Sequence, residues 1–90
     1  MKKTELLQHL NLEIERLKQK RYQELLKLTE EVETRQSGEG DSFYQVEIQA
    51  LYDNKMEGTL RVLVAIDDGG WRAFKPLTGD FLVTPQDQLL

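Results

Sequence analysis

The chain has 90 residues, of which 39% are apolar and 31% are charged, and its formal net charge at pH 7 is −4. This length and balance are typical of one folded domain with a modest core, so a deep cleft between two lobes is not expected. The chain has no cysteine, which excludes disulfides, thiolate metal sites and thiol nucleophiles and fits a reducing compartment.

The beginning of the chain, MKKTELLQHLNLEIERLK, carries two lysines but no uninterrupted apolar run of the kind that a signal peptide contains. No stretch of the sequence approaches the ~20 apolar residues that span a bilayer. We therefore expect a cytoplasmic protein with no membrane partner.

Charge is divided unevenly along the chain. Residues 1–36 hold eight Lys or Arg and seven Glu, a net charge of +1. Residues 37–90 hold four Lys or Arg and nine Asp or Glu, a net charge of −5. Because nucleic-acid binding needs a surplus of cations, we expect no nucleic-acid partner. The local basic cluster, typical of a solvated helix face, comprises Arg16, Lys18, Lys20, Arg21 and Lys27.

Residues 4–35 contain no glycine or proline and consist mainly of good helix formers, which predicts an amphipathic helical segment over this range. Arg21 occupies the one position in the apolar series that should itself be apolar. The other members of this series are Leu7, Leu10, Ile14, Leu17, Leu25, Leu28 and Val32.

A continuous helix of this length would measure about 48 Å, whereas a globule of this size has a diameter of about 30 Å. Either the segment breaks near residues 19–22 and both pieces lie on a sheet, or it overhangs and pairs with another chain. The broken form is the one we favour.

The hydrophobic period then changes from 3.6 to 2, which indicates strands. Residues 43–52 and 59–66 alternate in this way and are joined by a short turn-rich connection, so they are expected to pair as an antiparallel hairpin. The residues that should face the core are Tyr44, Val46, Ile48, Ala50, Tyr52, Leu60, Val62, Val64 and Ile66.

The sequence "DDGG" at 67–70 predicts a second hairpin turn, followed by a strand over 71–75. A two- or four-residue loop pairs Ile66 with Trp71, Val64 with Ala73 and Val62 with Lys75, whereas a three-residue loop would shift this register by one. "LTGD" at 77–80 is expected to be a turn, and a short fourth strand is expected over 81–84.

The predicted fold is therefore α+β: the helical segment 4–35 packed on a three- to four-stranded antiparallel meander. The whole chain, 1–90, forms one small domain. Its helical part is 1–36 and its sheet part is 43–90.

Residues with catalytic potential are few and isolated. Asp67 and Asp68 are interpreted as turn residues rather than an acid–base pair, because a tight turn leaves both in water. Gly69 and Gly70 precede strand-like residues, whereas phosphate-binding glycine loops precede a helix. His9 is the only histidine, and one histidine without cysteine does not make a conventional zinc site. We expect no catalytic residue, no cofactor and no metal.

The sheet face away from the helix should carry apolar residues among charged ones, which suggests contact with a protein partner or a second copy of the chain. The candidate contact residues are Phe43, Leu51, Leu63, Arg72 and Phe74. The open alternative is that residues 77–90 fold back and cover this face. The sequence thus favours a small, non-catalytic interaction or adaptor module, acting through this face or its long helix.

A second hypothesis belongs to another functional class. A small-molecule-binding domain or degenerate enzyme would have a pocket between helix and sheet. The candidate lining residues of that pocket are Tyr22, Tyr44, Tyr52 and Trp71.

Overall fold

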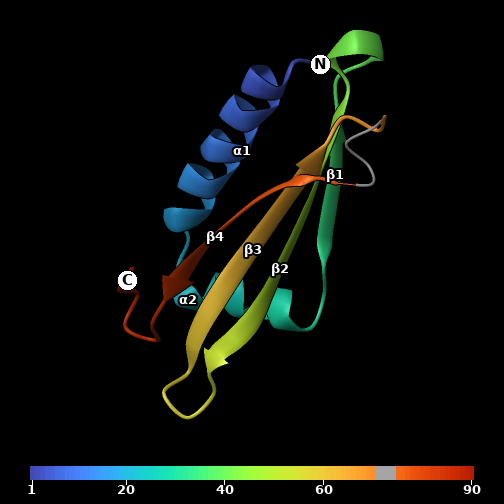
Figure 1. Cartoon of the computed structure of the whole chain (residues 1–90). Helices are drawn as coiled ribbons and strands as arrows, with labels where there is room; N and C mark the ends of the chain where they lie inside the picture. Colours follow the sequence, from blue (N-terminus) through green and yellow to red (C-terminus); the bar gives the residue numbers. More distant parts are fainter. Residues whose placement is uncertain (71–74) are drawn as a thin grey trace.

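The computed structural model describes residues 1–70 and 75–90. Three helical segments come first, a fourth, η2, lies between β1 and β2, and the four strands form one open antiparallel sheet in the order β1-β2-β3-β4. The elements are α1 (Lys3–Lys18), α2 (Tyr22–Leu26), η1 (Lys27–Thr29), β1 (Glu33–Ser37), η2 (Gly40–Ser42), β2 (Tyr44–Asn54), β3 (Thr59–Asp67) and β4 (Leu77–Val83). Helix α1 lies along one face of the sheet (Figure 1). The predicted α+β fold is confirmed.

The helical segment breaks where the apolar series is interrupted. The last turn of α1 tightens, because the N–H groups of Gln19 and Lys20 bond the carbonyls three residues earlier. Arg21 then adopts an extended backbone, with φ −78° and ψ 154°, and α2 starts at Tyr22. The break avoids placing a guanidinium on the buried side of a continuous helix. A straight helix of about 48 Å would also exceed the longest dimension of the molecule, which is 43 Å.

The prediction that the helical segment continues to residue 35 was wrong. The chain leaves the helical conformation after Thr29, and residues 33–37 form the edge strand β1, paired with β2. The sequence of β1, ETRQS, has no apolar side chain that a helix could bury. Pairing with β2 supplies backbone hydrogen bonds, and Glu33 and Arg35 form ion pairs with Arg16 and Glu13 of α1. These tertiary interactions override helix propensity, so the sheet begins at 33 rather than 43.

The core lies between α1 and the two central strands. As predicted, the alternate residues of β2 and β3 point toward the helix and are buried, although Tyr44 is only half-buried and Tyr52 is exposed. Their neighbours across the interface include Leu6, Leu10 and Leu17 of α1. The buried apolar residues of the described strands are Val46, Ile48, Ala50, Leu60, Val62, Val64, Ile66, Phe81 and Val83.

The expected register of β3 with the following strand was wrong. Ile66 pairs with Leu77, Val64 with Gly79, and Val62 with Phe81, so these three residues of β3 have partners in β4. The predicted strand over 71–75 falls, except for its last residue, outside the described residues, as do the predicted positions of Trp71 and Ala73.

Strand β4 includes "LTGD", so the predicted turn at 77–80 is wrong. Gly79 is at a close approach of helix and sheet: a Cβ atom there would lie 2.5 Å from Cδ1 of Ile14 in α1. The glycine therefore serves packing rather than chain reversal, since it makes room for α1 on the inner face of β4.

The segment after β4 does not cover the second face of the sheet. The N–H of Leu90 bonds the carbonyl of Leu82, and Leu89 bridges Val83 along the strand edge. The carboxylate of Asp87 accepts a 2.6 Å hydrogen bond from the N–H of Tyr22, at the start of α2. Figure 1 shows this end of the chain near α2. The segment thus borders β4 and α2, and no residue of 1–70 or 75–90 packs over the opposite face of the sheet.

Candidate functional site

The candidate site is the open face, by which we mean the sheet face that points away from α1. Because side chains alternate along a strand, the residues between the buried ones point to this side. All of them are exposed or half-buried. The open face comprises Thr34, Gln36, Gln45, Glu47, Gln49, Leu51, Asp53, Arg61, Leu63, Ala65, Asp67, Thr78, Asp80 and Leu82.

An apolar strip crosses the three longer strands of the open face. Arg61 of β3 pairs with Leu51 of β2 on one side and with Leu82 of β4 on the other. Leu63, two residues along β3, is therefore diagonal to both leucines, within reach of their side chains. Ala65 continues the strip. Leu51 is 54% exposed, although leucine belongs to the residue types most often buried.

Acidic side chains border the apolar strip. The guanidinium of Arg61 bonds Asp53, with Nη2 2.9 Å from Oδ1, and it also bonds Asp80. The hydrogen bonds of Asp53 and then of Asp80 raise the pKa of Arg61 above its ordinary value. With Glu47 and Asp67, the described open face has four carboxylates and one guanidinium, a net charge of −3. Its one cation is already engaged by two of these carboxylates.

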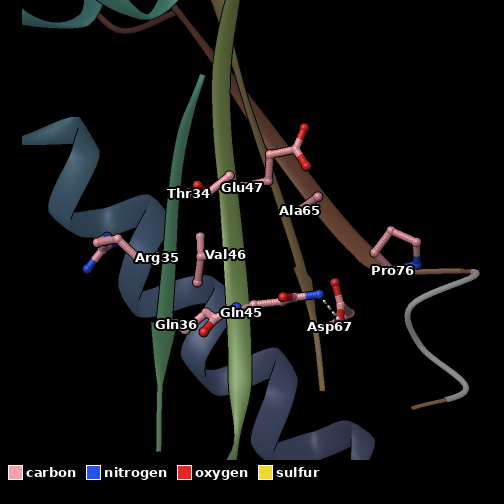
Figure 2. Close-up of a pocket in the computed structure, with 9 residues that line it drawn as sticks. All are labelled: Thr34, Arg35, Gln36, Gln45, Val46, Glu47, Ala65, Asp67 and Pro76. Carbon is pink, nitrogen blue, oxygen red and sulfur yellow. Dashed lines mark hydrogen bonds between the residues drawn. The ribbon is translucent and has the colours of Figure 1, made fainter. Parts of the chain in front are cut away.

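A depression of about 590 Å³ lies on this side of the sheet, at the end away from Leu51 (Figure 2). Gln45 and Asp67 join across its floor, because Nε2 of Gln45 donates a 2.8 Å hydrogen bond to Oδ1 of Asp67. The carboxylate of Glu47 is exposed, and no described residue bonds it. The depression thus offers the carboxylates of Glu47 and Asp67, which suit a cationic or hydrogen-bond-donating group. Arg35 also lines it, but its guanidinium bonds Glu13 of α1.

The structure brings only part of the predicted contact set together. Leu51 and Leu63 lie in the apolar strip, as expected. Phe43 precedes β2 and packs against the turn after β3, since a Cβ atom on Gly69 would lie 3.0 Å from its ring. Arg72 and Phe74 lie outside the described residues.

Asp80 and Leu82 are among the open-face residues that were not predicted. Asp80 lies in the part of β4 that is predicted as a turn, whereas Leu82 lies in the predicted strand 81–84, whose facing the sequence leaves open. The period of 2 in LTGDFLV, with larger apolar residues at alternate positions, was the signal that could have placed them.

The three described tyrosines do not line one pocket. Tyr44, at the start of β2, stacks on His9 of α1 with ring centroids 4.3 Å apart. Tyr22 lies near the other end of β2, where its hydroxyl donates a 2.6 Å hydrogen bond to the carbonyl of Gly58. Burial, and then the nearby Tyr52, raise the pKa of Tyr22 above its ordinary value. Trp71 lies outside the described residues.

The acids at 67–68 act as turn residues in the described part of this loop. Oδ1 of Asp67 accepts the N–H of Gly69, and Oδ1 of Asp68 accepts the N–H of Gly70. This backbone bond, and then the chain's terminal ammonium 3.5 Å away, lower the pKa of Asp68. Both interactions favour an ionised carboxylate, whereas a general acid at neutral pH needs a raised pKa.

Within residues 1–70 and 75–90, no three His, Asp or Glu side chains are grouped so that they could hold a metal ion. Over the same residues, no helix has the length and apolar character needed to cross a membrane. Comparisons of the chain with protein-family models, curated proteins and solved structures found no match. Its function is therefore argued from its own geometry and charge.

Proposed function

We propose that this protein is a small, non-catalytic interaction or adaptor module of the cytoplasm that binds a protein through its open sheet face. The observation that carries the proposal is the apolar strip of Leu51, Leu63, Ala65 and Leu82 on a face that no described segment covers. Contiguous exposed apolar surface is typical of protein contacts. The partner can be a different protein or a second copy of this chain.

The open face is a better candidate than the two other sites that the sequence suggests, a long helix and a pocket between helix and sheet. Helix α1 has 16 residues and packs on the sheet, so there is no overhanging helix to offer a partner. The depression between α1 and the sheet measures about 230 Å³, below the ~300 to 1,000 Å³ typical of small-molecule sites. Of the described tyrosines, only Tyr44 lines it. The open face has neither obstacle.

The test compares two exposed leucines. Leu51 lies in the apolar strip and is 54% exposed, whereas Leu12 lies on α1 and is 68% exposed. Full burial of a leucine side chain contributes about 1.5 to 3 kcal/mol, and binding can bury only the exposed half of Leu51, so Leu51→Ser should weaken partner binding about four- to fifteenfold. Leu12→Ser is the matched control and should change binding less than twofold.

Immobilised wild-type, Leu51→Ser and Leu12→Ser proteins would be exposed to native lysate, and captured proteins identified by mass spectrometry. Affinities of the purified partner would then be measured by calorimetry, and self-association by sedimentation. Binding that depends on Leu51 and not on Leu12 supports the proposal. Identical capture, affinity and sedimentation of all three proteins would overturn it.

A further inference from the structure

We propose that the occupant of the open face is a basic amphipathic helix of another protein, with lysine or arginine beside its apolar residues. This inference rests on the proposed function, and it specifies the partner's chemistry. Its basis is the combination of the apolar strip and an acidic border on one face that none of the described residues covers.

Charge distinguishes a foreign partner from a second copy. The open face has a net charge of −3 over its described residues, and the whole chain has −4. A two-fold dimer through this face would place the same acidic surface on both sides of the contact. Juxtaposed like charges disfavour that contact, whereas a basic surface is complementary to it.

Arg61, the cation of the described open face, does not offset the preference of this face for a basic partner. Arg61 is held on both sides, by Asp53 and by Asp80. Glu47, in contrast, is exposed and bonded by no described residue, so its charge is available to an incoming cation. Asp67 lies at the same depression, with Oδ1 already accepting the hydrogen bond of Gln45.

The distance between the apolar strip and the depression suits a helix. Leu63 of the apolar strip and Asp67 at the depression lie four residues apart on β3, which is about 13 Å along a strand. Residues seven or eight apart on one helix face are separated by about 11 to 12 Å. A helix with an apolar side chain at one position and a lysine or arginine seven or eight residues later can therefore contact both features. It would complete a helix–sheet–helix arrangement, with α1 on the other side.

The test uses two synthetic helical peptides as probes. Both carry leucines on one face at positions i, i+3, i+4 and i+7; one has lysine and the other glutamate at the flanking positions. Each is titrated into the full chain labelled with ¹⁵N. The lysine peptide should shift backbone signals of residues 45–51, 61–67 and 78–82, and the glutamate peptide should not bind.

Charge-neutral variants identify the acids responsible. The double variant Glu47→Gln/Asp67→Asn keeps the size of both side chains, and the amide introduced at position 67 retains an acceptor oxygen for Gln45. It should weaken binding of the lysine peptide about three- to tenfold. The matched control Asp41→Asn/Glu57→Gln removes two exposed acids elsewhere and should change binding less than twofold.

The inference is overturned if both peptides bind equally, if the shifts map to α1, or if the two double variants bind equally. It is also overturned, while the proposed function stands, if a partner that depends on Leu51 contacts the face through an acidic or neutral segment. Self-association that is lost in Leu51→Ser would identify a second copy as the occupant instead. If Leu51→Ser and Leu12→Ser behave alike with native partners, the proposed function fails as well.

Discussion

Tyr22 links a short helix to a turn of the sheet through one side chain. It is 6% exposed, and its hydroxyl donates a 2.6 Å hydrogen bond to the carbonyl of Gly58. We expect Tyr22→Phe to lower the free energy of unfolding by about 1 kcal/mol, because that carbonyl loses its partner. Tyr52→Phe, at a 44% exposed tyrosine, is the control and should change stability by less than about 0.5 kcal/mol. Urea denaturation at pH 7 measures both values, and equal effects would contradict this role of Tyr22.

The same tyrosine should give stability a dependence on alkaline pH. The pKa of Tyr22 is raised in the folded protein by burial and by Tyr52, whereas an unfolded tyrosine has a pKa of about 10. The folded state therefore favours the neutral hydroxyl: its contribution is complete below about pH 10 and is lost as pH rises through the folded pKa. The free energy of unfolding should fall less steeply above pH 10 in Tyr22→Phe than in the wild type. Parallel pH profiles of the two proteins would rule this contribution out.

At the scale of elements, the approach of α1 to β4 depends on the missing side chain of Gly79. We expect Gly79→Val to lower the free energy of unfolding by about 1–3 kcal/mol, because its side chain would overlap Ile14. The loss should be smaller in an Ile14→Ala background, where the opposing atoms are absent. Thr78→Val is the control on the opposite face and should change stability by less than about 0.5 kcal/mol. Thermal and urea denaturation measure these values, and a cost independent of Ile14 would disprove the contact.

A second link between elements joins the C-terminal segment to α2. Asp87 has φ 63° and accepts the N–H of Tyr22. Asp87→Ala should lower the free energy of unfolding by about 1–2 kcal/mol, since alanine lacks the acceptor and tolerates this backbone poorly. Asp87→Asn retains both properties and should cost less. Hydrogen exchange of the Tyr22 amide should accelerate in Asp87→Ala alone; equal exchange in both variants would contradict the capping role.

Elements could be predicted from the sequence where their own apolar and polar residues show the period of a strand or a helix. The alternation in β2 and β3 fixed their buried faces, and the polar residue at Arg21 marked the break between the helices. β1 was not predictable in this way, because its polar residues suit a helix and its strand conformation depends on pairing with β2, about ten residues later. Gly79 was misleading for a similar reason, since the need for a glycine arises from α1, far away in the sequence.

The residues of the open face could be predicted from the sequence only where the strand that carries them could be predicted. Leu51 and Leu63 follow from the alternation of β2 and β3. Leu82 and Asp80 depended on recognising β4, and the packing of Phe43 against the turn at Gly69 is a tertiary contact with no local signal. The acidic border was present in the composition, but its assembly on one face required the register of three strands.

At the scale of the whole molecule, the helical elements cover one side of a four-stranded sheet, and the described residues leave the other side to solvent. Removal of one apolar side chain from that open side should scarcely affect folding, because it is already in water. Leu51→Ser should therefore change the free energy of unfolding by less than about 0.5 kcal/mol, although it weakens partner binding. A large loss of stability would show instead that Leu51 belongs to the core.

The role of the open face is tested most directly by methyl NMR of the leucine-labelled chain in concentrated native lysate, compared with buffer. The methyl signals of Leu51, Leu63 and Leu82 should shift or broaden, while those of Leu7 and Leu12 on α1 stay unchanged. Signals that are identical in lysate and buffer, or changes confined to Leu7 and Leu12, would contradict a partner-binding open face.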